Sequence, residues 1–76
     1  MIIEELNKNL LEAAKQGDIE GVKKVLEQGA DVNARSKDGR TAMIEAARWG
    51  RLTPTLLELL ASHEADVNAV NEYGWT

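Results

Sequence analysis

The chain has 76 residues, which limits it to one domain, and it contains no cysteine with which to build a disulfide or a thiolate zinc site. Thirteen acidic residues against nine basic residues give a net charge of −4, which argues against a nucleic-acid partner. No apolar run approaches the roughly 20 residues of a membrane span, and the N-terminus lacks the pattern of a signal peptide. We therefore expect a cytoplasmic protein without membrane contact.

The first predicted elements are two short helices separated by a glycine. Apolar residues recur at helical spacing along the first helix at Ile3, Leu6, Leu10 and Leu11. Gly17 can adopt the left-handed conformation that ends a helix, and Asp18 has the side chain of an N-cap. The inner face of the second helix carries Val22, Val25 and Leu26, and Gly29 ends it. An extended segment with a turn at Asp38-Gly39 follows.

The next predicted elements are a second pair of helices. A helix is expected from about Ala42 to Trp49, with Gly50 as its stop and Thr53-Pro54 as the N-cap and first residue of a leucine-rich helix. Glu64 falls where a glycine suits the backbone. We therefore expect this last helix to end differently from its counterpart, about a turn later.

Three blocks of sequence recur in the same order. Leu11 to Gly17 matches Ile44 to Gly50 at an offset of 33, whereas Ala30 to Ala34 matches Ala65 to Ala69 at an offset of 35. The turn at Asp38 to Thr41 matches Tyr73 to Thr76, again at 35. A fixed period of this length is the signature of a helical solenoid, and the change of offset places two extra residues in the second copy.

The repeated blocks resemble the ankyrin repeat, in the segments Gly-Ala-Asp-Val-Asn-Ala (29–34), Asp-Gly-Arg-Thr-Ala (38–42) and Glu-Ala-Ala-Arg-Trp-Gly (45–50). The resemblance implies an all-α fold, an α-solenoid of two antiparallel helix pairs with projecting hairpin loops. It divides the single domain (1–76) into an N-terminal cap-like repeat (6–35), an internal repeat with a two-residue insertion (36–70) and the start of a third repeat (71–76). The family's usual histidine is replaced by Ile44, which we expect to be packed.

No catalytic or cofactor-binding constellation can be assembled from these residues. His63 is the only histidine, so no imidazole cluster can hold a metal within one chain. The glycines never form a phosphate-cradling cluster with a lysine. Asp31 and Asp66 are better explained by hydrogen bonds that close their loops. We therefore expect a protein that is not an enzyme and that needs no cofactor or metal.

The resemblance implies a protein partner, bound by the hairpin tips and the exposed side of each first helix. The corresponding positions are Lys37, Asp38, Arg40, Arg48 and Trp49 in the second copy, Glu72, Tyr73 and Trp75 in the third, and Lys15 and Gln16 in the first. Tryptophan, tyrosine and arginine dominate interface hot spots, which favours this assignment. The alternative is that Trp49 packs on a neighbouring loop and that Tyr73 and Trp75 cover the end of the stack.

A second hypothesis concerns the last helix pair, which has no polar capping helix after it. Some of its apolar residues are then expected to face solvent, among Met43, Ile44, Leu57 and Leu60. Under this hypothesis the chain is a truncated or designed repeat scaffold that forms homo-oligomers through the uncapped face, with no natural partner.

Overall fold

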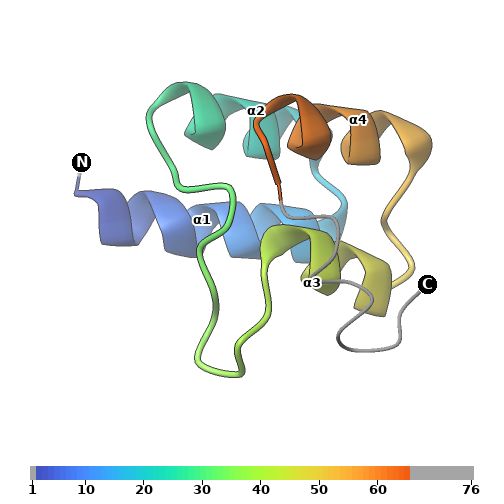
Figure 1. Cartoon of the computed structure of the whole chain (residues 1–76), viewed down its shortest axis with the longest axis horizontal. Coiled ribbons are helices and arrows are strands. Elements are labelled where there is room, and N and C mark those ends of the chain that lie inside the picture. Colours follow the sequence, from blue (N-terminus) through green and yellow to red (C-terminus); the bar gives the residue numbers. More distant parts are fainter. Residues whose placement is uncertain (1, 66–76) are drawn as a thin grey trace.

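The structure is a computed structural model that describes residues 2–65. These residues form four helices, α1 (Ile3–Gln16), α2 (Ile19–Glu27), α3 (Ala42–Arg48) and α4 (Pro54–Ser62), and contain no strand. The chain reverses between α1 and α2 and again between α3 and α4, so each pair is antiparallel (Figure 1). The expected all-α class with two antiparallel helix pairs is confirmed.

The four helices lie in two layers, with the first helices α1 and α3 in one layer and the second helices α2 and α4 in the other (Figure 1). Helix α1 packs against both α2 and α3, and α2 contacts α4. The segment that joins α2 to α3 runs past the first-helix layer and turns back beyond it (Figure 1). We call the end of this segment, residues 35–40, the hairpin tip.

The second helices begin, and the first helices end, at residues with the local chemistry of a cap or a stop. The side chain of Asp18 accepts a hydrogen bond from the Gly21 amide at 3.0 Å, and Thr53 Oγ1 accepts one from the Leu56 amide at 3.3 Å. Both residues cap the amides left free at a helix N-terminus, as predicted. Gly17 and Gly50 follow α1 and α3 with φ of 72° and 69°, a region open to glycine at little cost.

The last helix ends in the same way as its counterpart, so the expected extra turn is wrong. Helices α2 and α4 both have nine residues. Glu64 takes the left-handed conformation with φ of 67°, at the position where Gly29 has φ of 107°. The amide that follows each of them donates to an equivalent carbonyl, from Ala30 to Val25 at 3.0 Å and from Ala65 to Leu60 at 3.1 Å. These hydrogen bonds close the helix end and hold Glu64 in a conformation that glycine tolerates better.

The two extra residues of the second copy lie among residues 51–53, in the loop before α4. Gly50 keeps the role of Gly17, whereas the two roles of Asp18 are divided between two residues. The Arg51 amide donates to the Ala46 carbonyl at 2.7 Å, as the Asp18 amide donates to that of Ala13 at 2.9 Å, and Thr53 caps α4. Leu52, between them, packs against the core.

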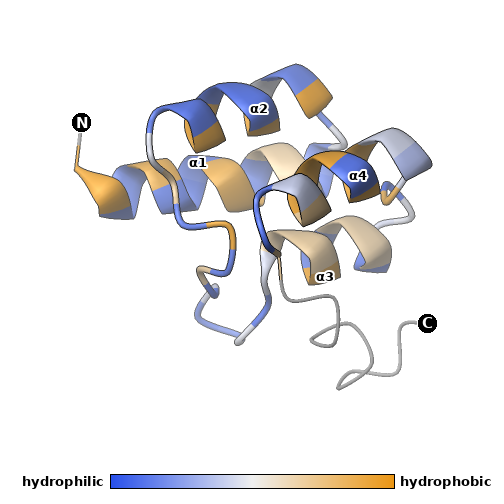
Figure 2. Cartoon of the chain, turned by 45° about the horizontal axis from the view of Figure 1, so that its top comes forward, coloured by the Kyte–Doolittle hydropathy of each residue, from blue (hydrophilic) through white to orange (hydrophobic). Residues whose placement is uncertain are grey.

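The core lies between the two layers and is built from aliphatic side chains. The inner side of α2 is hydrophobic and its outer side is hydrophilic, as Figure 2 shows. The largest fully buried side chains come from all four helices: Leu10, Val22, Met43, Ile44, Leu56 and Leu60.

Burial of the second helix pair shows which of its apolar residues face solvent. Some of Met43, Ile44, Leu57 and Leu60 were expected to be exposed; of these four, Leu57 is exposed, at 40%, and the other three are buried. Their side chains belong to the same cluster as Leu10 and Val22 of the first pair. The packing of Ile44 in the family's histidine position is confirmed.

Candidate interaction surface

The hairpin tip is held in one shape by its own hydrogen bonds. The Ser36 amide donates to the Arg40 carbonyl at 2.8 Å, and the Gly39 amide donates to the Ser36 carbonyl at 2.9 Å. Ser36 Oγ accepts from the amides of Asp38 and Arg40, both at 3.2 Å. Arg35 Nη1 donates to the Gly39 carbonyl at 2.8 Å. A turn tied at this many points presents its side chains without a large entropic cost of ordering.

The three predicted residues of the tip differ in how far they are available to a partner. Lys37 and Asp38 are exposed, and the Asp38 side chain retains 72% of its accessible surface. The Arg40 side chain is only 23% exposed, and its Nη1 donates to Asp38 Oδ2 at 3.3 Å. Arg40 therefore supports the tip as well as contributing to its surface.

The loop below the tip is tied to the first helix. The Asp31 amide donates to Asn7 Oδ1 on α1 at 2.7 Å, and Asp31 Oδ1 accepts from the Asn33 amide at 2.9 Å. The second bond confirms the loop-closing role predicted for Asp31. Asn33 Nδ2 donates to the Glu64 carbonyl at 3.2 Å, which joins the first repeat to the end of α4.

A groove of about 530 Å³ lies between α1, the hairpin and α3. Its lining contains both acidic and basic side chains and is formed by Glu4, Asn7, Lys8, Leu11, Glu12, Ala34, Arg35, Ser36, Lys37 and Glu45. Of these residues only Lys37 was predicted. The glutamates Glu12 and Glu45 stand 33 residues apart at equivalent positions of two helices, and this correspondence in the repeat alignment is the signal that points to them.

The second predicted cluster surrounds Trp49, the C-cap of α3. The Trp49 side chain is half exposed, at 50%. Lys15 Nζ lies 5.2 Å from the centre of a Trp49 ring and the Arg48 guanidinium carbon lies 5.7 Å from one, both within the range of a cation–π interaction. Trp49 is therefore exposed rather than packed away, and it joins the ends of α1 and α3.

Arg51 was not predicted, yet the structure places it beside this cluster. Its side-chain carbons lie 3.2 to 3.4 Å from the position that a Cβ on Gly17 would take, so the arginine stem lies across the end of α1. The signal in the sequence was the residue after Gly50, which is Arg51 where the first copy has Asp18 after Gly17.

The predicted partner-binding residues therefore fall into two separate clusters. Lys37, Asp38 and Arg40 precede α3, whereas Arg48 and Trp49 stand at its other end. A helix of seven residues separates them by roughly 10 Å, at 1.5 Å per residue. Glu72, Tyr73 and Trp75 lie outside the described residues.

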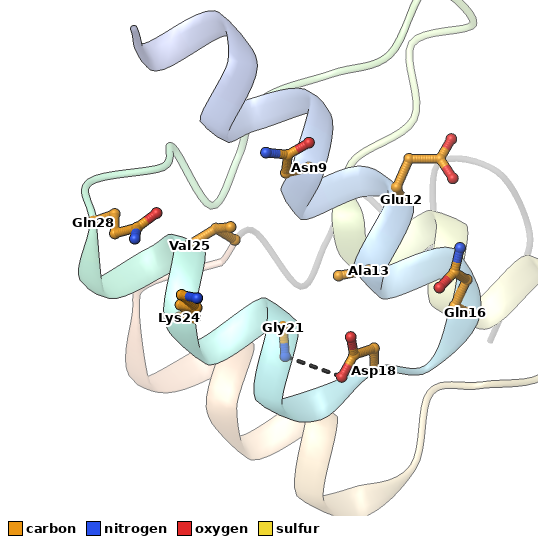
Figure 3. A pocket seen from close by; sticks show the side chains of 9 residues that line it. All are labelled: Asn9, Glu12, Ala13, Gln16, Asp18, Gly21, Lys24, Val25 and Gln28. Carbon is orange, nitrogen blue, oxygen red and sulfur yellow. Dashed lines mark hydrogen bonds between the residues drawn. The ribbon is translucent and has the colours of Figure 1, made fainter. Parts of the chain in front are cut away.

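A further groove lies on the outer side of the first helix pair, away from these clusters. Figure 3 shows polar side chains along both of its walls, among them Asn9, Glu12 and Gln16 from α1, Lys24 from α2 and Gln28 from the C-cap of α2. The small residues Ala13 and Gly21 lie between the walls, next to the Asp18 cap (Figure 3).

The arrangement of residues 2–65 also bears on metal binding and on membrane insertion. No group of three or more histidine, cysteine, aspartate or glutamate side chains in this range is arranged to hold a metal ion. None of the helices in the same range has the length and hydropathy that crossing a bilayer requires.

Comparison with known proteins gives consistent matches. The family model described as ankyrin repeats (3 copies) matches residues 10–76. The chain is similar to serine/threonine-protein kinase 12 of Arabidopsis thaliana, with 39% identity over 88% of the chain and 14% of the kinase. It is also similar to a putative ankyrin repeat protein of Rickettsia felis, with 45% identity over 64% of the chain and 78% of that protein.

The neurogenic locus notch homolog protein 1 of Xenopus tropicalis is 41% identical over 84% of the chain, which corresponds to 2% of that protein. The chain thus spans only a small part of the kinase and of the Notch protein.

Proposed function

Because the chain belongs to the ankyrin-repeat family, whose repeats mediate protein–protein interactions and are typically non-enzymatic, we propose that it binds a partner protein through the hairpin tip and the exposed side of its first helices. The proposed contact residues are Lys37, Asp38, Arg40, Arg48 and Trp49, together with Glu72, Tyr73 and Trp75 from the third repeat. No cofactor takes part.

The observation that carries this proposal is the exposure of Trp49. A tryptophan loses favourable burial when half of it faces water, and this chain has only two. At an interface the same side chain becomes an anchor, because it buries a large area and has few rotatable bonds. The rigid hairpin tip supports the proposal, since its side chains are already ordered before a partner arrives.

Affinity capture of partners from a lysate, with the immobilised chain and with its Trp49→Ala/Arg40→Ala variant, tests this site. We expect the double variant to lose at least about tenfold in affinity for the captured protein, the usual effect of removing a hot spot. The control is Ile3→Ala/Lys23→Ala, which removes one exposed apolar side chain and one cation elsewhere. Unchanged affinity in a folded Trp49→Ala/Arg40→Ala variant would contradict the assignment.

Self-association remains a prediction, and fewer exposed residues support it than the sequence suggested. Of Met43, Ile44, Leu57 and Leu60, only Leu57 offers an exposed side chain. Light scattering over a concentration series separates the two hypotheses, because a strict monomer at high concentration contradicts self-association.

A further inference from the structure

The end of the molecule at which α1 and α3 stop gathers positive charge around Trp49. Lys15 and Arg48 lie over the tryptophan, and the stem of Arg51 lies across Gly17, which follows α1. We call Lys15, Arg48, Trp49 and Arg51 the Trp49 patch. Its members come from two helices and from the loop before α4, so only the folded chain brings them together.

The charge of the patch is not neutralised within residues 2–65. No carboxylate in this range forms an ion pair with Lys15, Arg48 or Arg51. The C-termini of α1 and α3 favour cations, but each supplies only about half a negative charge. The three positive charges of the patch therefore exceed the partial negative charge of the two helix ends, although the net charge of the whole chain is −4.

The second copy differs from the first at this patch. In the first copy the equivalents of Arg48, Trp49 and Gly50 are Lys15, Gln16 and Gly17, and the Asp18 amide donates to the Ala13 carbonyl as the Arg51 amide donates to that of Ala46. The first copy therefore has an acidic residue where the patch has Arg51, and the hydrogen bond to Ala46 and the packing of Leu52 hold this cation in place. A half-exposed aromatic ring among three anchored cations presents an apolar surface with a positive border.

We propose that the Trp49 patch binds an acidic segment of a partner protein, with carboxylates beside the three cations and an apolar side chain over the exposed part of Trp49. This rests on the function proposed above and specifies the chemistry of the partner at that site. Complementary charge raises the association rate and selects against basic partners, while the aromatic contact supplies affinity.

A titration followed by NMR tests this proposal on the whole chain, because the Trp49 indole N–H gives its own signal. A Trp75→Phe variant distinguishes the two indole signals. Three end-blocked peptides of equal length are added in turn: Glu-Glu-Leu-Glu-Glu, Gln-Gln-Leu-Gln-Gln and Lys-Lys-Leu-Lys-Lys. We expect the acidic peptide alone to shift the Trp49 indole signal and the amide signals of Lys15, Arg48 and Arg51. Raising the salt concentration from about 0.05 M to about 0.5 M is expected to weaken the binding of the acidic peptide several-fold, because salt screens exposed charges.

The variant Arg48→Glu/Arg51→Glu is expected to bind the acidic peptide at least tenfold more weakly. Its matched control, Lys23→Glu/Lys24→Glu, makes the same change in net charge on the exposed side of α2 and is expected to alter binding less than twofold. Equal weakening in the two variants overturns the proposal, because net charge alone then explains the result.

The proposal is also overturned if the basic or neutral peptide shifts the same signals as strongly, if millimolar acidic peptide shifts none, or if a thymidine oligonucleotide binds more tightly. If one of these results is found but a captured partner still depends on Trp49 and Arg40, the proposed function stands and only the specificity for acidic segments is wrong. Conversely, if the patch binds the acidic peptide but the chain captures no partner, only the proposed function is contradicted.

Discussion

The outer face of the first helix pair and the equivalent face of the second pair lie on equivalent helices but differ in composition. The first face is polar and the second is apolar. Asn9, Gly21 and Lys24 occupy the positions that Ala42, Leu56 and Leu59 occupy 33 or 35 residues later. The first set lines a polar groove, whereas Ala42 and Leu56 are fully buried and Leu59 packs against the core (Figure 3). One face meets water and the other meets a neighbouring helix pair.

This difference shows that the helical repeat and the composition of its faces are separate properties. The N-cap of each second helix and the glycine after each first helix are retained in both pairs, because they satisfy the backbone of the helices. The side chains between the pairs follow what each face contacts, since an apolar face gains stability only where a neighbour covers it.

The largest effect is expected when a buried residue of the second helix pair is replaced by its counterpart in the first pair. Leu56→Gly is expected to lower the free energy of unfolding by about 4 kcal/mol, because a buried leucine leaves a cavity and glycine weakens a helix. Urea denaturation followed by circular dichroism measures this loss. A decrease below about 1 kcal/mol would show that the second pair repacks around the gap.

The reverse exchange gives the first pair the apolar character of the second. Asn9→Ala/Lys24→Leu is expected to change unfolding free energy by less than about 0.5 kcal/mol, since both positions are exposed. The new apolar face is expected to cause self-association, because nothing covers it. Sedimentation of the variant and the parent chain at matched concentrations measures self-association. If the variant stays monomeric, as a monomeric parent chain does, the expectation is wrong.

The helix ends allow a smaller exchange. Glu64→Gly gives α4 the residue that ends α2 and is expected to raise the free energy of unfolding by about 1 kcal/mol, because the backbone there has positive φ. Thermal unfolding measures the gain, and Gly29→Glu is the matched control with an expected loss of similar size. A neutral Glu64→Gly variant would mean that the glutamate side chain compensates for its strained backbone.

The smallest expected effect comes from exchanging the helix caps. Asp18→Thr gives α2 the cap of α4 and is expected to cost less than about 0.5 kcal/mol, because aspartate and threonine both accept a hydrogen bond from the third residue of the helix. Asp18→Ala is the control, with an expected loss of about 1 kcal/mol in the same unfolding experiment. If the threonine variant lost as much as the alanine variant, the charge of Asp18 would be the important property.

Much of the candidate surface was predictable, although its grouping was not. The repeat alignment placed Lys37, Asp38 and Trp49 on exposed positions, where the structure has them. It also placed a helix between the hairpin tip and Trp49, but it did not show that Arg51 joins the Trp49 patch. Lys15 and Trp49 are far apart in the chain, and their contact depends on how α1 packs against α3.

The sequence by itself determined the helix pairs, their caps and the stops of α1, α2 and α3, because these depend on residues within a turn or two of one another. Asp18, Thr53 and Gly17 act on the amides and carbonyls of their own helices. Tertiary structure decided which apolar residues are covered, so Met43, Ile44 and Leu60 are buried and Leu57 is exposed. It also decided where the extra residues lie, since a change of offset is compatible with any position between two matched blocks and only packing selects one.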